Sequence, residues 1–125
     1  VAGMTPTWNI DVSGTRRSIA LTAVVDTGFD GELCVPLDAA VSLGLELIGR
    51  ATIQLADGSH KRELLFAGSV TLLGVTREVE LSLTESDQAL IGTALLTGCQ
   101  LAIDFDAEKV HLWRRPGRRR RAKSK

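Results

Sequence analysis

The residues best suited to chemistry lie in one short stretch, Val24–Gly31, which reads VVDTGFDG. The two β-branched valines predict a strand that ends at Asp26, and the Thr-Gly pair that follows predicts a sharp turn. A carboxylate at the end of an apolar strand costs free energy unless it is hydrogen-bonded, paired or used in a reaction. The local residues leave these possibilities open, because Asp-Thr-Gly is also ordinary turn chemistry.

The segments around this stretch are predicted to be mostly strands. Apolar or alternating runs occupy residues 7–12, 17–25, 33–35, 51–55, 63–66, 68–73, 76–83, 89–91, 100–105 and 109–113. Ser13-Gly14 and Ala56–Ser59 carry hairpin-turn signals. Many short strands separated by turns every 8–12 residues or so favour a closed β-barrel or a sandwich with one or two short helices.

Two segments have the spacing of short helices. The first is Asp38–Leu45, in which three- and four-residue spacing predicts a buried face. That face would consist of Leu37, Ala40, Val41, Gly44 and Leu45. The second is Thr93–Leu96, which Gly98 would end.

Length and composition indicate one globular domain. The chain has 125 residues, of which 44% are hydrophobic and 24% charged. It contains no apolar run of about 18 residues, so no membrane span is predicted. Cys34 and Cys99 lie among apolar neighbours without a CxxC pair, which favours free thiols in a reducing compartment, the cytoplasm, over a disulfide or a metal site.

The charges divide the chain into an acidic body and a basic tail. Residues 1–113 hold seven basic and fifteen acidic side chains, whereas residues 114–125 hold eight basic side chains and no acid. We therefore expect a domain at 1–113 followed by a disordered tail at 114–125. The tail has three interpretations: a solvated arm without a fixed role, a weak contact to nucleic acid or an acidic partner, and self-association with the acidic body.

Three motifs in this order resemble the retropepsin-like (clan AA) aspartic proteases, the single-domain relatives of retroviral protease. They are DTG at 26–28, LIGTALL at 90–96 and LAIDF at 101–105. The resemblance spans roughly residues 8–113, and Phe29 after the DTG is similar to the form seen in some bacterial members. It implies a retropepsin-like closed β-barrel that supplies half of an aspartic-protease active site.

The resemblance also implies a mechanism and a partner. Two carboxylates that share one proton activate a water, so a chain with one DTG would act as a homodimer in which Asp26 meets its symmetry mate. The Thr27 hydroxyl would brace the loop across the two-fold axis, and Gly28 would allow close approach. Leu90–Gly92 would support the loop from beneath. The implied activity is an endopeptidase acting on peptides or proteins without a cofactor or metal.

The remaining site residues would contact the substrate. Ala56, Asp57, Gly58 and Ser59 lie where the family has its flap, a hairpin that closes over an extended peptide. Phe29 would either line a specificity pocket or pack into the core. Asp30 would be either a substrate contact or an ordinary loop acid. The alternative function is a retropepsin-fold module that binds peptides or dimerises with little or no proteolysis.

Overall fold

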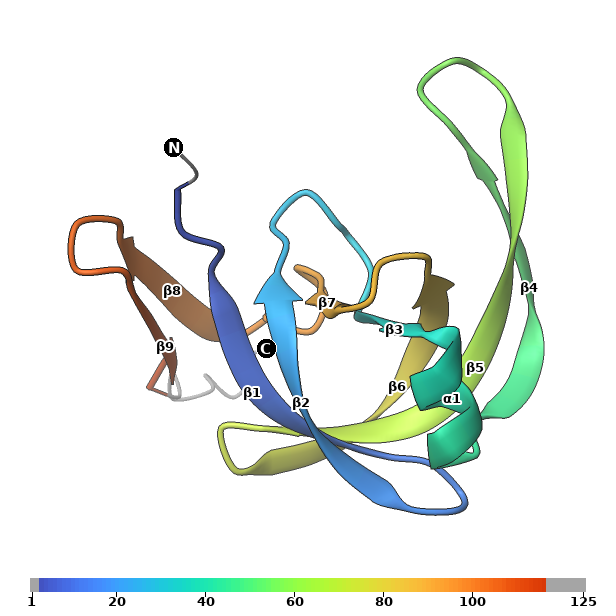
Figure 1. Cartoon of the computed structure of the whole chain (residues 1–125), viewed down its shortest axis with the longest axis horizontal. Helices are drawn as coiled ribbons and strands as arrows, with labels where there is room; N and C mark the ends of the chain where they lie inside the picture. The colour runs from blue at the N-terminus through green and yellow to red at the C-terminus, as the bar shows by residue number, and fades with distance from the viewer. Residues whose placement is uncertain (1–2, 117–125) are drawn as a thin grey trace, which may run out of the picture.

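The computed structural model describes residues 3–116, which form nine strands and one helix (Figure 1). The strands are β1 (Thr7–Ser13), β2 (Ser18–Val25), β3 (Leu33–Pro36), β4 (Glu46–Gln54), β5 (His60–Leu72), β6 (Val75–Thr84), β7 (Ala89–Ile91), β8 (Cys99–Asp104) and β9 (Lys109–Arg114), and the helix is α1 (Leu37–Leu43).

Six of the strands close into a barrel. They pair in the order β1-β2-β7-β3-β6-β5, and β5 pairs back with β1. β4 pairs with the outer part of β5, and β8 and β9 form a separate two-stranded sheet. The predicted mainly-β closed barrel with a short helix is therefore confirmed.

The core of the barrel comes from the alternation of its strands. Side chains that point inward belong to one hydrophobic cluster, whose largest fully buried members are Val12, Leu33, Val35, Leu43, Val70, Leu81, Ile91 and Leu95. Strand alternation places the polar side chains between them on the outer surface. Burial of this cluster is the main force that holds the strands in register.

The strand β7 is the element that determines where the DTG loop lies. It pairs parallel to β2, with Val25 opposite Ile91, and antiparallel to β3, with Leu33 also opposite Ile91. The chain leaves β2, makes the loop at residues 26–32 and returns as β3 on the other side of β7. The loop after β2 is thus anchored at both ends to neighbours of one buried strand.

The buried face predicted for α1 is wrong. Its buried residues are Ala40 and Leu43, whereas Leu37 and Val41 are 61% and 60% exposed. The helix is only seven residues long, so it packs against the barrel through a single i, i+3 pair and leaves its other apolar positions outside. Gly44, at φ +72°, ends it in the left-handed region.

Two other segment predictions differ from the structure. Residues 93–97 form successive turns and no helix, because the amides of Leu95 and Leu96 bond three residues back, to Gly92 and Thr93. Residues 63–66 and 68–73 belong to one long strand, β5. Gly68, the first residue of the second predicted run, lies within that strand, and a Cβ there would lie 3.0 Å from the Ser13 carbonyl oxygen, so the backbone of β1 passes close to it.

The described chain extends slightly beyond the body predicted from charge. Arg114 is the last residue of β9, and its guanidinium donates to the Leu72 carbonyl over 3.2 Å. The Arg115 amide donates to the Gly98 carbonyl over 2.9 Å. The three interpretations of the tail concern mainly residues 117–125, which lie outside the described residues. Within residues 3–116, no helix has the length and apolar character needed to cross a membrane.

Candidate active site

Asp26 lies at the mouth of the barrel, directly after the last residue of β2. Its amide donates to the Ile91 carbonyl over 2.9 Å, which continues the β2–β7 pairing by one residue. Its Oδ1 accepts a hydrogen bond from the Gly28 amide over 3.0 Å. The side chain is half-buried, and within residues 3–116 no ion pair reaches it. The hydrogen bond from Gly28 therefore positions the carboxylate, and no cation within residues 3–116 pairs with it.

The turn beyond Asp26 is open to solvent. Thr27 and Gly28 are both exposed, and the Phe29 amide donates to the Asp26 carbonyl over 3.1 Å to close the turn. A Cβ at Gly28 would lie 3.3 Å from the Asp26 Oδ1, so glycine leaves room for the carboxylate. The turn is therefore hydrogen-bonded and exposed, and the half-buried Asp26 carboxylate lies at its start.

Backbone hydrogen bonds from residues 92–94 hold this loop, whereas the resemblance implied support from Leu90–Gly92; Gly92 is the residue common to both. The amides of residues 92–94 donate to the carbonyls of Glu32, Phe29 and Gly31 over 3.0, 2.8 and 3.1 Å respectively. A Cβ at Gly92 would lie 2.1 Å from the Gly31 carbonyl oxygen. The two backbone segments are therefore so close that only glycine fits at position 92.

Phe29 packs on its own loop and lines a cavity, and it does not belong to the hydrophobic core cluster. Its ring packs on its own loop, since a Cβ at Gly31 would lie 2.6 Å from the ring Cζ and one at Gly92 2.7 Å from the ring Cδ2. The same side chain also lines a cavity of about 680 Å³. Phe29 thus stabilises the conformation of the loop and also forms part of the cavity wall.

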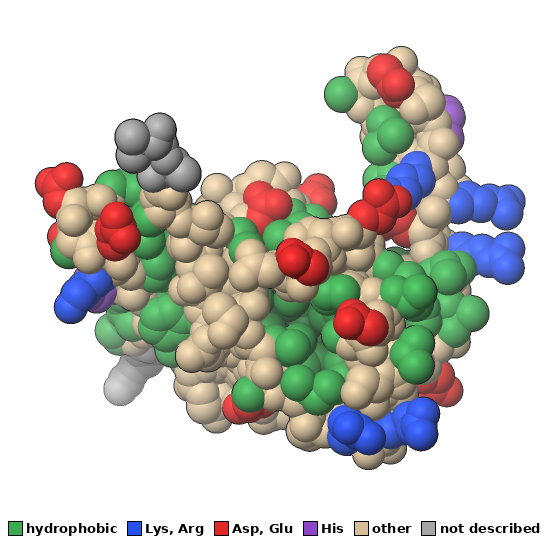
Figure 2. All heavy atoms as spheres, viewed as in Figure 1, with side chains coloured by type: hydrophobic (Ala, Val, Ile, Leu, Met, Phe, Trp, Pro, Cys, Tyr) green, Lys and Arg blue, Asp and Glu red, His purple; other side chains and the backbone are tan. Residues whose placement is uncertain are grey.

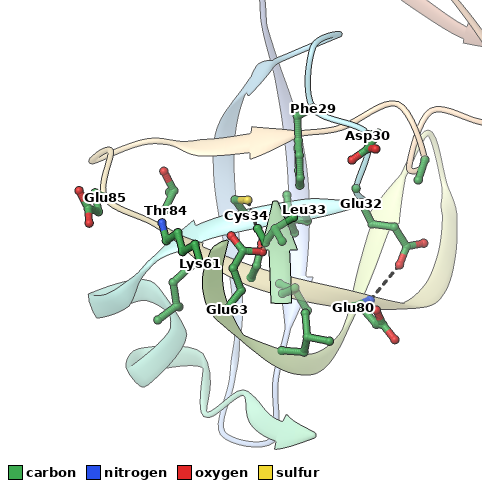
Figure 3. A pocket seen from close by; sticks show the side chains of 17 residues that line it. Phe29, Asp30, Glu32, Leu33, Cys34, Lys61, Glu63, Glu80, Thr84 and Glu85 are labelled. Carbon is green, nitrogen blue, oxygen red and sulfur yellow. Dashed lines mark hydrogen bonds between the residues drawn. The ribbon is translucent and has the colours of Figure 1, made fainter. Parts of the chain in front are cut away.

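That cavity lies between the DTG loop and the stem of the β4–β5 hairpin (Figure 3). Apart from backbone and small residues, its apolar lining is Phe29, Leu33, Ile53, Leu65, Leu81 and Leu83, and its charged lining is Asp30, Glu32, Lys61, Glu63, Glu80 and Glu85. Of the predicted site residues, Phe29 and Asp30 line it, whereas Asp26, Thr27, Gly28 and residues 56–59 do not.

The β4–β5 hairpin rises from the barrel on the same side as the DTG loop, with its tip well separated from the body (Figures 1 and 2). Its tip is a tight turn in which Gly58 has φ +89° and the Leu55 amide donates to the Ser59 carbonyl over 2.7 Å. The Asp57 Oδ1 accepts from the hydroxyl and the amide of Ser59, and these bonds lower the pKa of Asp57. The structure does not bring the tip to Asp26.

Cys34 and Ser82 form part of the cavity wall beneath the loop. The Cys34 Sγ lies 3.0 Å from the Ser82 Oγ, and both residues are buried. Burial raises the pKa of the Cys34 thiol, against the opposite effect of the Ser82 hydrogen bond. Both cysteines are free thiols, as predicted; Cys34 is buried and Cys99 is half-buried.

The site residues predicted from the sequence do not include several that line the cavity, above all Lys61, Glu63 and Glu80. One signal was available in β5, where Lys61, Glu63 and Leu65 alternate and so share one face of the strand. Sequence alone did not show that this face meets the segment at residues 29–34, because that contact depends on how the barrel closes.

Solved structures with a similar fold include two retroviral proteases and a retroviral protease-like domain. Simian foamy virus (mac) protease matches with a TM-score of 0.55 and 20% identity over 74% of this chain and 92% of that chain. The inhibitor-bound EIAV protease matches with a TM-score of 0.55 and 14% identity, covering 74% of this chain and 86% of its own.

The third structure is the retroviral protease-like domain of Ddi1 from Leishmania major, with a TM-score of 0.53 and 16% identity over 90% of each chain. No protein-family model and no curated protein sequence matches this chain. At these identities the comparisons establish the fold, and the chain has a retropepsin-like fold.

Proposed function

We propose that the chain is an aspartic endopeptidase that is active as a homodimer. The observation that carries this proposal is the Asp26 carboxylate, fixed at the mouth of a retropepsin-like barrel without an ion-pair partner within residues 3–116. A second copy related by a two-fold axis that passes beside Asp26 would bring a second Asp26 to the first, because residues close to such an axis meet their own copies. DTGF at 26–29 further supports a place among the bacterial members of the family.

The proposed reaction is hydrolysis of a peptide bond by one activated water. One Asp26 is ionised and takes a proton from the water, while the protonated Asp26 of the other copy donates its proton to the substrate carbonyl oxygen. The new C–O bond gives a tetrahedral intermediate. The C–N bond then breaks as the Asp26 that took the water's proton gives it to the nitrogen and a hydroxyl of the intermediate returns a proton to the other Asp26, which releases a carboxylic acid and an amine. No metal or cofactor takes part.

The neighbouring residues have supporting roles in this proposal. Exposed Thr27 would hydrogen-bond across the two-fold axis, and Gly28 would leave room for the partner loop. The hairpin tip at residues 56–59 would close on bound substrate and exclude water, which requires it to move from the position in Figure 1. Phe29 and Asp30 would contact the substrate, since both line the cavity.

Two further proposals concern the setting of the enzyme. Both cysteines are free thiols, which supports a reducing compartment such as the cytoplasm. The change in charge near residue 114 supports a catalytic domain followed by a basic tail, and β9 extends that domain to Arg114, one residue beyond the predicted boundary. A deletion of residues 117–125 that leaves turnover and thermal stability intact would support this division.

Turnover is expected to be highest at acidic pH and to fall toward neutral pH. The proposed reaction needs two carboxylates that share one proton, and in general rising pH disfavours such a shared proton. The measurement is the pH profile of kcat/KM on a broad peptide library, with a pepstatin-like transition-state mimic as inhibitor. Binding of peptides without turnover at every pH would instead identify the chain as a peptide-binding module.

A further inference from the structure

We infer that the cleft beside the DTG loop selects peptides that carry lysine or arginine on both sides of a central apolar residue. This inference rests on the proposed peptidase function and adds the class of substrate. Three observations support this inference: the acidic charge of the cavity wall, the placement of its carboxylates along the cavity, and the apolar residues between them.

The cavity wall is strongly acidic. It contains five carboxylates and one ammonium group, that of Lys61. Glu32 is already neutralised, because it forms an ion pair with Arg77 and also accepts from the Glu80 amide over 2.9 Å. Asp30, Glu63, Glu80 and Glu85 form no ion pair within residues 3–116. Four uncompensated carboxylates therefore face one cation.

The free carboxylates are spread along the cavity. Figure 3 shows Glu85 at one end, Asp30 and Glu80 toward the other, and Glu63 between them. They come from different elements, since Glu63 belongs to β5, Glu80 to β6, and Glu85 follows β6 directly. In an extended peptide that lies along the cavity, side chains several residues apart would reach its two ends. Basic residues on both sides of the peptide's centre would therefore each meet a carboxylate.

The floor between these charges is apolar. Leu81 and Leu33 are fully buried beneath it, and Phe29, Leu65 and Leu83 complete its surface. An apolar side chain at the centre of the peptide would lose contact with water there. The same carboxylates would repel peptides with aspartate or glutamate at the flanking positions, so the wall discriminates by repulsion as well as attraction.

Three matched peptides test this inference on the full-length protein. They share one central apolar segment and differ only in flanking residues, which are lysine and arginine, glutamine and serine, or glutamate. The basic peptide is expected to have a KM roughly tenfold below that of the neutral one, from several weak pairs acting together, and the acidic peptide a higher KM than both. Raising the salt concentration should narrow these differences.

A pair of variants assigns the preference to the cleft. Replacing the three carboxylates together, Glu63→Gln, Glu80→Gln and Glu85→Gln, is expected to raise KM for the basic peptide to near that of the neutral peptide, with kcat little changed. Glu78→Gln is the matched control, because Glu78 is exposed on the same strand as Glu80 but does not line the cavity. It should leave the preference intact.

The possible results separate this inference from the peptidase proposal. Equal KM values for the three peptides, with turnover present, would overturn the inference and leave the peptidase function standing. If no peptide is cleaved, the peptidase proposal fails, and fluorescence anisotropy with the same peptides labelled still decides the inference. The inference is supported if the parent protein binds the basic peptide more tightly than the other two and the triple variant does not. Binding that is independent of peptide charge contradicts the inference.

Discussion

Asp26→Asn is expected to lower kcat/KM by at least about 10³-fold while leaving fold and dimerisation unchanged, since general acid–base catalysis contributes up to about 10⁴-fold. The asparagine keeps the size of the side chain and an oxygen that accepts from the Gly28 amide, so the turn survives. It can neither take a proton from water nor share one with a second carboxylate. The measurement is turnover of a library-derived peptide, with circular dichroism and sedimentation as checks.

The matched control is Asp11→Asn. Asp11 is exposed on β1, far along the strand from the barrel mouth. Its replacement by asparagine removes one negative charge, as Asp26→Asn does. This control should retain full activity. Cleavage by Asp26→Asn at the parent rate would rule out Asp26 as the catalytic group, whatever the fold.

Gly92→Ala is the substitution with the largest expected effect on stability. The added Cβ would lie 2.1 Å from the Gly31 carbonyl oxygen and 2.7 Å from the Phe29 ring, so the DTG loop or β7 must shift. Crowding of this kind costs about 1–3 kcal/mol of unfolding free energy. Because the amides of residues 92–94 hold the loop, activity should fall as well. Urea unfolding and kcat/KM give the two readouts.

Gly49→Ala provides the comparison for that experiment. No atom lies within 4 Å of a Cβ built at Gly49, and its backbone does not require glycine. Its free energy of unfolding should stay close to the parent value. Equal stability of the two alanine variants would show that residues 92 and 31 are less closely packed than the structure has them.

The sequence predicted those features of the site that depend on neighbours along the chain. The apolar strand before Asp26, the turn at Thr27-Gly28 and the hairpin at residues 56–59 each follow from local residue types, and all are present in the structure. The buried β7 segment was also predicted, since a short apolar run before a glycine is typical of a core strand.

The features it did not predict depend on contacts across the barrel. The apolar spacing in α1 indicated a wide buried face, but the barrel offers room for only Ala40 and Leu43. The acidic wall of the cavity unites side chains from β5, β6 and the DTG loop, which become neighbours only after β3 pairs with β6. Periodicity within one strand shows which residues share a face and leaves open what that face meets.

Mixing the parent protein with the Asp26→Asn variant tests the shared active site most directly. If each site needs one Asp26 from each copy, random exchange of subunits at equal amounts leaves roughly a quarter of the dimers with both. The activity per parent chain should then fall to about half, and further as more variant is added. Activity per parent chain that stays constant at every mixing ratio would contradict the account, because each chain would then carry a complete site.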